Sequence, residues 1–397
     1  MMRLNRDKHP ARFAIVTSVA SGLVVVTIAT IAGHFDFHLL AYKVPLWALV
    51  LPLLAAIGSL ALSVALLRNW KTEVFFIPCA LNEKRYIAEL IYNLHDVLDA
   101  HQLDLVLKVP RRDYAHVGQL HHLRSLRRRR GKYFGGIVIP AEPELIRPDL
   151  KEFCSFALYP VVFVDIEPFV QTEEYPRDTA FVGYHQGAIG SCAASYVEEH
   201  ARNSRISRPQ IWVIAEKWYT GRQLEFIKKL RSCFKNAEFL VDESGEYSRA
   251  RARAIVCRNL QDQSQERVVP HYIFCTNDEM ALGAVDALRI ANIGNDGSVV
   301  VVGVDGTPEA RALIDSQTTP LCATVVQDSC EIAEVAVDRL VRMNRGDAVR
   351  THTYLEPHIY QSSHFIASPR RAVAINNFGE TIGPSGERLG PPRNDLA

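Results

Sequence analysis

The chain has 397 residues, enough for roughly two to three domains, and 48% of them are hydrophobic against 22% charged, so most of it can fold around a core. A formal net charge of +1 argues against a protein that binds nucleic acid over its whole surface. The eight cysteines form neither a CxxC pair nor a metal-type cluster. We therefore expect small buried cysteines in a reducing compartment, and neither a metal nor a cofactor.

Two long uncharged apolar runs open the chain, at residues 13–33 and 45–67. Each exceeds the ~20 residues that a helix needs to cross the hydrocarbon core. The loop between them, residues 34–44, is short, which favours a helical hairpin. Residues 1–71 are therefore predicted to be a membrane anchor with two transmembrane helices.

The basic residues around these runs predict the topology of the anchor. Four precede the first run, two follow the second, and only Lys43 lies in the loop. The positive-inside rule then predicts a multi-pass protein of the bacterial inner membrane, with its soluble part on the cytoplasmic face. In the alternative interpretation the first run is a cleavable signal peptide, and the periplasmic face stays open for the soluble part.

The soluble part, up to about residue 367, alternates strands and helices as a doubly wound α/β protein does. In its first half we expect strands at 74–77, 103–107, 136–139 and 161–164, with helices at 86–100 and 114–130. In its second half we expect strands at 180–182, 210–215, 237–241, 272–275, 299–304 and 323–326, with helices at 186–200, 221–234, 247–259, 280–291 and 331–343. Residues 368–397 are rich in Gly, Pro and charge and are predicted to be a disordered tail.

Three of these strands lead directly into a polar side chain. The strand at 272–275 is followed by Asn277, the strand at 299–304 by Asp305, and the strand at 323–326 by Gln327. Open α/β sheets bind ligands at the carboxyl ends of their strands. Short amide and carboxylate groups suit the hydroxyl groups of a ligand, so the pattern predicts a binding site.

Three ordered motifs surround these residues: NDEMALGA at 277–284, VGVDG at 302–306 and TVVQ at 324–327. Together they resemble the sugar-binding module of type I periplasmic binding proteins, of the ribose/galactose kind, and of the lac-repressor family. The resemblance implies an α/β fold of two lobes with Rossmann-type sheets, after the N-terminal transmembrane hairpin. It also implies a first lobe of residues 72–181 plus 328–352, and a second of 182–327 plus 353–367.

The resemblance transfers a set of ligand-binding positions to this chain: Asn82, Asp165, Arg222, Asn277, Asp305 and Gln327. A carboxylate, a guanidinium and amides that converge in the cleft between the lobes would orient a polyol. Two alternatives stay open at this point. Asn277 is also a candidate N-cap of the helix that follows it. Arg222 is also a candidate for a salt bridge between the lobes.

The chain departs from the family pattern in its aromatic residues. Where the family places an aromatic pair, to stack on the sugar ring, only Tyr86 remains. The other stacking aromatic is Tyr247, or Trp218 or Tyr219 from another loop. The ligand class therefore stays open between a sugar, a nucleoside and another polar metabolite, with an empty, degenerate pocket as the alternative.

Residues 121–130, HHLRSLRRRR, are the strongest charge cluster of the chain. Three interpretations stay open: a solvated helix end that favours the helix dipole, contact with anionic lipid, and contact with nucleic acid. His121 and His122 are adjacent and cannot bind one metal from a single helix face. DNA binding is not expected, because the apolar runs occupy the place where lac-repressor relatives carry a helix-turn-helix.

No nucleophile with a base, no paired carboxylates and no phosphate-binding loop are found, so an enzyme is not expected. The sequence instead predicts a membrane-anchored, non-enzymatic receptor that senses a small polar, sugar-like ligand by hinge closure. Its predicted partners are the lipid bilayer and a membrane protein. Two alternatives are a solute receptor that delivers sugar to an ABC-type permease, and a ligand-gated effector whose hairpin oligomerises.

Overall fold

The computed structural model describes residues 72–81, 85–128, 132–217, 220–261, 269–294 and 297–362, with the single positions 54 and 58. The expected anchor (1–71) with its spans at 13–33 and 45–67, the expected tail (368–397) and Asn82 therefore lie outside the described residues. Within the described part, no helix is both long enough and apolar enough to span a membrane.

The described chain divides into two compact units. The first contains residues 72–80, 91–181 and 333–351, and the second contains residues 81–90, 182–332 and 352–362. After residue 91 the chain passes between the units three times, between residues 181 and 182, 332 and 333, and 351 and 352. The described strands form two six-stranded sheets, and two strands of the first sheet, at 179–184 and 352–355, extend into the residues of the second unit.

The first sheet has the strand order β11-β5-β4-β3-β1-β2. Parallel pairing joins β1 to β2 and β3, and β3 to β4. The inner strands β1, β3, β4 and β5 are short runs of mostly buried residues, as expected for a sheet covered on both faces, while β2 and β11 are more exposed. Their bounds are β1 Glu73–Ile77, β2 Asp104–Leu107, β3 Gly135–Val138, β4 Val161–Val164, β5 Thr179–Tyr184 and β11 His352–Leu355.

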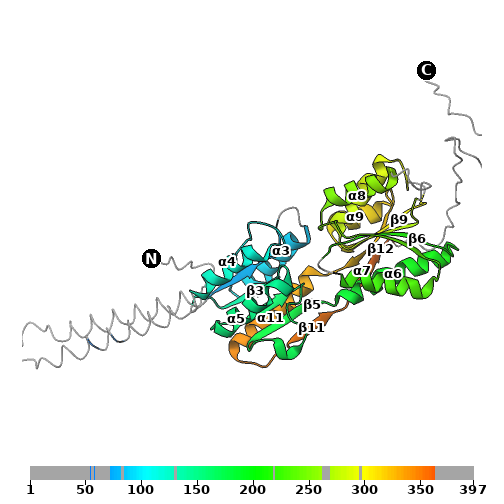
Figure 1. Cartoon of the computed structure of the whole chain (residues 1–397). Coiled ribbons are helices and arrows are strands. Elements are labelled where there is room, and N and C mark those ends of the chain that lie inside the picture. Colours follow the sequence, from blue (N-terminus) through cyan, green and yellow to red (C-terminus); the bar gives the residue numbers. More distant parts are fainter. Residues whose placement is uncertain are drawn as a thin grey trace, which may run out of the picture. The chain divides into compact units, whose positions relative to one another are not determined.

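Helices follow the strands of this sheet: α3 Arg85–Ala100, α4 His116–Arg127, α5 Pro143–Phe156 and α11 Ser329–Arg345 (Figure 1). The sequence did not predict α5, because Pro148 lies inside this helix and interrupts the helical pattern. Pro143 occupies the first turn, where proline is tolerated. Ile146, Leu150 and Phe153 are buried at helical spacing, so packing stabilises a helix that local propensity disfavours.

The second sheet has the strand order β12-β10-β9-β8-β6-β7. Its neighbouring strands pair in parallel from β7 to β10, and β12 pairs with β10 in antiparallel orientation. The bounds are β6 Gln210–Ile214, β7 Glu238–Asp242, β8 Tyr272–Cys275, β9 Val300–Asp305, β10 Leu321–Val326 and β12 His358–Gln361. The expected α/β fold with parallel Rossmann-type sheets is confirmed.

Two layers of helices enclose the second sheet (Figure 1). One face carries α6 Gln186–Asn203 and α7 Gly221–Cys233, which pack against each other. The other face carries α8 Arg249–Gln261 and α9 Asp278–Ile290, also packed as a pair. The remaining elements are α10 Pro308–Ser316, between β9 and β10, and the 3₁₀ turn η1 Thr172–Glu174 of the first unit.

Candidate functional site

The strand order of the second sheet defines where a ligand can bind. From β6 the chain runs through α7 to β7 on one side, and from β8 it runs through α9 to β9 on the other. The helices that follow β6 and β8 therefore cover opposite faces of the sheet (Figure 1). Such a switch leaves a crevice at the carboxyl ends of the two strands, the preferred ligand site of open α/β sheets.

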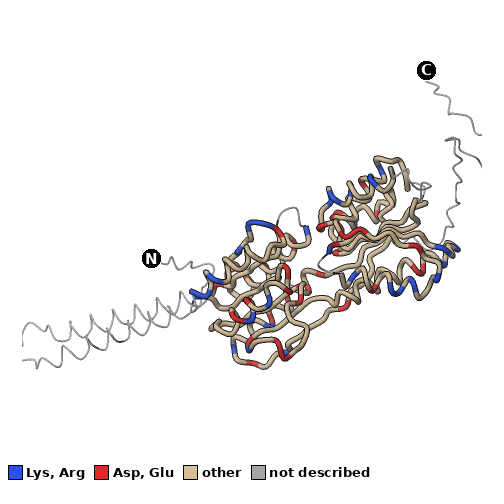
Figure 2. The backbone as a smooth tube through the Cα atoms, in the orientation of Figure 1, with Lys and Arg blue, Asp and Glu red and all other residues tan. Residues whose placement is uncertain are grey.

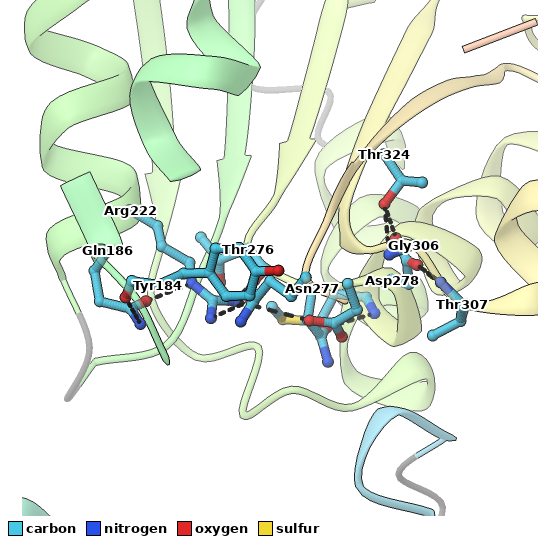
Figure 3. Close-up of polar contacts among 12 residues, drawn as sticks. Tyr184, Gln186, Arg222, Thr276, Asn277, Asp278, Gly306, Thr307 and Thr324 are labelled. Atoms are coloured by element: carbon cyan, nitrogen blue, oxygen red, sulfur yellow. Dashed lines mark hydrogen bonds and ion pairs between the residues drawn. The ribbon is translucent and has the colours of Figure 1, made fainter. Parts of the chain in front are cut away.

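Arg222 lies at this switch point, in the first turn of α7, and its side chain is only 8% exposed. Three N–H groups of its guanidinium donate hydrogen bonds within the second unit (Figure 3). Nε donates to Gln186 Oε1 (2.6 Å), Nη1 to the Thr276 carbonyl oxygen (2.7 Å) and Nη2 to Gln327 Oε1 (2.7 Å). These bonds join the starts of α6 and α7 to the ends of β8 and β10.

Arg222 lies in surroundings that are unfavourable for a positive charge. The first turn of α7 contains no acidic residue, and a helix N-terminus carries a positive partial charge. The nearest carboxylate oxygen, Asp305 Oδ1, lies 4.0 Å from Nη1, beyond hydrogen-bond distance. A guanidinium has five N–H groups, and three of those of Arg222 donate to described residues.

Asp305 ends β9 with a strained backbone. Its φ angle is +117°, which L-residues rarely adopt, and the next residue, Gly306, has φ +73°. Strain of this kind costs about 1–3 kcal/mol and persists where function requires a particular orientation. The Asp305 carbonyl oxygen accepts from the Gln327 backbone N–H (3.2 Å), which brings the ends of β9 and β10 together.

Asn277 is the N-cap of α9, as one interpretation of the sequence expected. Its Oδ1 accepts a hydrogen bond from the Met280 backbone N–H at 3.0 Å. The side-chain amide of Asn277 still carries N–H groups, so this cap is compatible with ligand contact. The three side-chain hydrogen bonds of Arg222 all join it to residues of the second unit.

Asp278 lies directly beneath the site and is completely buried. Its Oδ2 accepts from the Thr307 backbone N–H (2.7 Å) and hydroxyl (3.0 Å), and its Oδ1 accepts from the Thr324 hydroxyl (2.7 Å) (Figure 3). The Thr324 hydroxyl in turn accepts from the Gly306 N–H at 3.2 Å. One carboxylate therefore ties together the segments that follow β8, β9 and β10.

Burial raises the pKa of Asp278 to about 7, against the hydrogen bonds from Thr324 and Thr307, which lower it. A β-carbon at Gly303, on β9, would overlap Asp278 Oδ1, so glycine leaves the space that this carboxylate occupies. The sequence did not predict that Asp278 is buried. Its burial depends on packing with residues some 30 and 46 positions away, which no local pattern shows.

Gln186 and Thr276 are two further site residues that the sequence did not identify. The structure shows that the Gln186 side chain supplies an acceptor for Arg222. Thr276 contributes its backbone carbonyl oxygen, so its side-chain type could not reveal its role.

Three more of the residues that the sequence proposed lie within the described part of the chain. Asp165 follows β4 in the first unit, is buried, and has φ +64°, a left-handed conformation like those found at functional sites. Tyr86 lies in α3, and Tyr247 precedes α8 with φ +52°; both are buried. The other candidates, Asn82, Trp218 and Tyr219, lie outside the described residues.

The position of Arg222 depends on close packing between α6 and α7. A β-carbon at Gly190, on α6, would overlap the Arg222 carbonyl oxygen. We therefore expect Gly190→Ala to push α7 away and to weaken ligand binding at least tenfold. Isothermal titration measures the effect, with Gly187→Ala as the matched control, because a β-carbon there meets only the movable His185 ring at 3.1 Å. Equal affinity of both variants would contradict a role of this contact.

Comparison with known proteins agrees with this architecture. Residues 133–348 match the family model described as periplasmic binding protein domain. The D-allose-binding periplasmic protein of Escherichia coli is 30% identical over 119 residues, which are 29% of this chain and 36% of that protein. The lactose operon repressor of E. coli is 32% identical over 90 residues, 23% of this chain and 24% of that protein. These matches therefore span about a third or less of the curated relatives.

Solved structures show the same fold over longer stretches. A periplasmic solute binding protein of an ABC transporter from Actinobacillus succinogenes, with bound D-allose, has a TM-score of 0.63 at 16% identity, covering 73% of this chain and 98% of that one. The Caulobacter myo-inositol binding protein bound to myo-inositol has a TM-score of 0.61 at 21% identity, covering 73% and 93%.

The two sheets and their helices define the class of two-lobed α/β binding proteins, and the family match covers more than half of the chain. The chain belongs to the periplasmic binding protein domain family. This family consists of binding proteins and not of enzymes, as the sequence predicted.

Proposed function

We propose that the chain is a membrane-anchored receptor for a small ligand of the sugar or cyclic polyol class. The observation that carries the proposal is the buried Arg222, held by Gln186, Thr276 and Gln327 and lying beside Asp305 at the carboxyl edge of the second sheet. In this site Arg222 donates to ligand oxygens while Asp305 accepts from ligand hydroxyls. The relatives with bound D-allose and myo-inositol support this ligand class.

A polyol suits the site for a physical reason. Two neighbouring hydroxyls are together donors and acceptors, so one ligand can satisfy a guanidinium and a carboxylate at the same time. An epimer that misplaces one hydroxyl leaves a buried polar group unpaired, which costs about 1–3 kcal/mol and provides discrimination. The amide groups of Asn277 and Gln327 add further orientation.

Several residues and segments that the sequence predicts to be functional also belong to the proposed receptor. Asn82 and Asp165 contribute to ligand binding from the first lobe, and Tyr86 and Tyr247 stack on the ligand. The two lobes close over the ligand by a hinge motion, and the ligand shifts that equilibrium only by its higher affinity for the closed form. The apolar runs at 13–33 and 45–67 hold the protein in the bacterial inner membrane. Closure of the lobes then acts on the membrane segment or on a membrane partner.

A screen by thermal unfolding tests the ligand class. The full chain in detergent is heated with pentoses, hexoses, inositols, nucleosides and nucleotides. A ligand at 100 times its Kd stabilises the folded state by about 2.7 kcal/mol, which is a clear shift in Tm. Asp305→Asn is expected to abolish that shift. The control, Asp315→Asn, changes an exposed aspartate at the end of α10 and should leave the shift unchanged.

The outcome of this screen separates the proposal from its alternatives. A hit among sugars or polyols that Asp305→Asn removes supports the proposal. A hit that both aspartate variants retain contradicts the site, and no hit in any class contradicts a working receptor and favours the empty pocket.

A delivery receptor for an ABC-type permease is the second candidate, favoured by the ribose import and ABC transporter relatives. It requires the soluble part to lie outside the inner membrane. Protease added to intact spheroplasts digests the soluble part in that case, and leaves it intact if this part faces the cytoplasm.

A further inference from the structure

The amino-terminal edge of the first sheet is rich in exposed arginines. Helix α4 ends there with Arg124 and Arg127 in its last turn and Arg128 as its C-cap, and α11 ends there with Arg345. Arg124, Arg128 and Arg345 are exposed and form no ion pair with another described residue. Figure 2 shows basic residues at this end of the unit, beside α4.

Hydrogen bonds show that these helix ends meet at one place. The Phe134 backbone N–H donates to the Glu73 carbonyl oxygen (2.8 Å), which joins the start of β3 to the start of β1. Asn344 Nδ2, at the end of α11, donates to the Phe134 carbonyl oxygen at 2.6 Å. Lys132 forms an ion pair with Glu73 at 2.6 Å. The ends of α4 and α11 therefore lie around the start of β1.

Two large apolar side chains are exposed at the same edge. Phe156, at the end of α5, is 42% exposed, and Leu158, just before β4, is 67% exposed. The Arg127 guanidinium lies over the Phe156 ring, 4.4 Å from its centroid, so the end of α5 adjoins the end of α4. We call Arg124, Arg128, Arg345, Phe156 and Leu158 together the basic edge.

The chain itself tethers the basic edge close to the second apolar run. That run ends at residue 67, and β1 begins six residues later, at Glu73. Six residues span at most about 20 Å when fully extended. In the sequence, Arg68 and Lys71 lie within this connection, and Arg129 and Arg130 follow Arg128, so further positive charge is adjacent along the chain.

The helix dipole accounts for basic residues in the last turn of a helix. It does not account for exposed arginines that lie beside exposed apolar side chains. Dipole compensation requires one or two cations at each helix end and no apolar surface. Exposed arginines mixed with an exposed aromatic ring and an exposed leucine are typical of surfaces that lie in the membrane interface. Because a short connection joins the basic edge to the second apolar run, a bilayer that contains this run is the surface within reach.

We propose that the basic edge docks on anionic lipid headgroups of the same bilayer that holds the apolar runs. Arg124, Arg128 and Arg345 bind headgroup phosphates, and Leu158 and Phe156 enter the interface between headgroups and acyl chains. This inference rests on the membrane anchor of the proposed function. It extends that function, because docking fixes the first unit on the membrane and leaves the second unit to move when ligand binds.

Acidic residues at the edge do not cancel this charge. Glu73 is paired with Lys132, and Glu152 with Arg127. Asp178 lies beside Arg177, at 3.6 Å. Asp99 at the end of α3, Asp104 and Asp347 are further carboxylates at this edge, against the three arginines of the basic edge and the basic residues that the sequence adds.

Hydrogen–deuterium exchange of the full chain in lipid nanodiscs tests the proposal. One set of nanodiscs contains phosphatidylcholine alone, and the other contains 30% phosphatidylglycerol. We expect peptides that cover residues 153–160 and 342–348 to exchange at least threefold more slowly in the anionic nanodiscs. Because headgroup binding is electrostatic, 0.5 M salt should remove most of this protection.

Variants identify the residues responsible. The triple variant Arg124→Gln, Arg128→Gln, Arg345→Gln should lose the lipid-dependent protection, and Leu158→Ser should reduce it. The matched control removes three exposed arginines from α8 of the second unit, as Arg251→Gln, Arg253→Gln, Arg258→Gln, and should keep it. Protection that the basic-edge triple variant retains would overturn the proposal.

Three further outcomes are informative. Equal exchange in both nanodiscs overturns docking while the anchor stands, as does protection of the same peptides by RNA but not by anionic lipid. Failure of the full chain to enter nanodiscs overturns the anchor, and docking with it. Ligand binding, measured by the thermal screen in detergent, is independent of these outcomes.

Discussion

Replacing Arg222 with methionine is expected to weaken ligand binding at least 100-fold and to destabilise the ligand-free protein by only about 1–3 kcal/mol. The affinity falls because charge-assisted hydrogen bonds to ligand oxygens are lost, and about 2.7 kcal/mol corresponds to this factor. The loss of stability is limited because removal of a buried cation at the start of α7 offsets part of the cost of leaving three buried acceptors without their donor.

Arg222→Lys refines this test. A lysine keeps the charge but cannot donate in a fork to Gln186, Thr276 and Gln327 at once, so its affinity should lie close to that of the methionine variant. Isothermal titration measures affinity, and urea unfolding measures stability without ligand. Arg231→Met, in the last turn of the same helix, is the control and should retain affinity.

The split between affinity and stability distinguishes two roles of Arg222. A residue that serves only structure would cost about 3–5 kcal/mol of stability when removed from a buried cluster. Such a loss, with wild-type affinity in the fraction that remains folded, would refute the assignment of Arg222 as a ligand-binding residue.

Replacing Asp278 with alanine is expected to cost about 3 kcal/mol or more of unfolding free energy. The change leaves the Thr307 backbone N–H, the Thr307 hydroxyl and the Thr324 hydroxyl without their acceptor in a buried place, and each such group costs about 1–3 kcal/mol. Asp278→Asn retains one oxygen and should cost less. Because the loops after β8, β9 and β10 carry the site, the alanine variant should also lose ligand affinity.

The pH dependence of stability provides an independent check on Asp278. Its folded-state pKa is about 7, above the ordinary aspartate value, so the folded protein binds more protons than the unfolded one between pH 4 and 7. Its contribution to stability is therefore fully present at low pH and declines as pH rises through this range. Asp278→Asn lacks this titration.

Urea unfolding at pH 4.5, 6.0 and 7.5 measures both proteins under matched conditions. The stability of the wild type relative to Asp278→Asn should decrease steadily as pH rises. Asp286→Asn, on the other side of α9 and paired with Arg249, is the control carboxylate. A difference between wild type and Asp278→Asn that stays constant with pH would refute a raised pKa.

Most strands and helices of this protein follow from local patterns. The strand predicted at 161–164 matches β4, and the strand predicted at 272–275 matches β8. Long amphipathic helices such as α6, α7 and α11 were found with shifts of a few residues at their ends. Two helices that were not predicted, α5 and α10, begin at Pro143 and Pro308, where the local pattern indicates a break. The short strands β11 and β12 were not predicted either.

Part of the site was also predictable from local sequence patterns. Asn277, Asp305 and Gln327 follow apolar strands in an ordered set of motifs, and parallel strands bring their carboxyl ends to one edge. Local pattern could not show that Gln186 and the Thr276 carbonyl hold Arg222, since these groups come from separate segments of the chain.

Hydrophobic periodicity and strand-end motifs were thus sufficient for the alternation of elements, the family resemblance and the edge at which the ligand is expected. These features depend on contacts within a few residues, which a linear pattern records. The orientation of Arg222, the burial of Asp278 and the meeting of α4, α5 and α11 around β1 depend on packing between distant segments. Long-range packing sets the environment of each charge, and that environment decides whether it binds a ligand, holds a loop or meets a membrane.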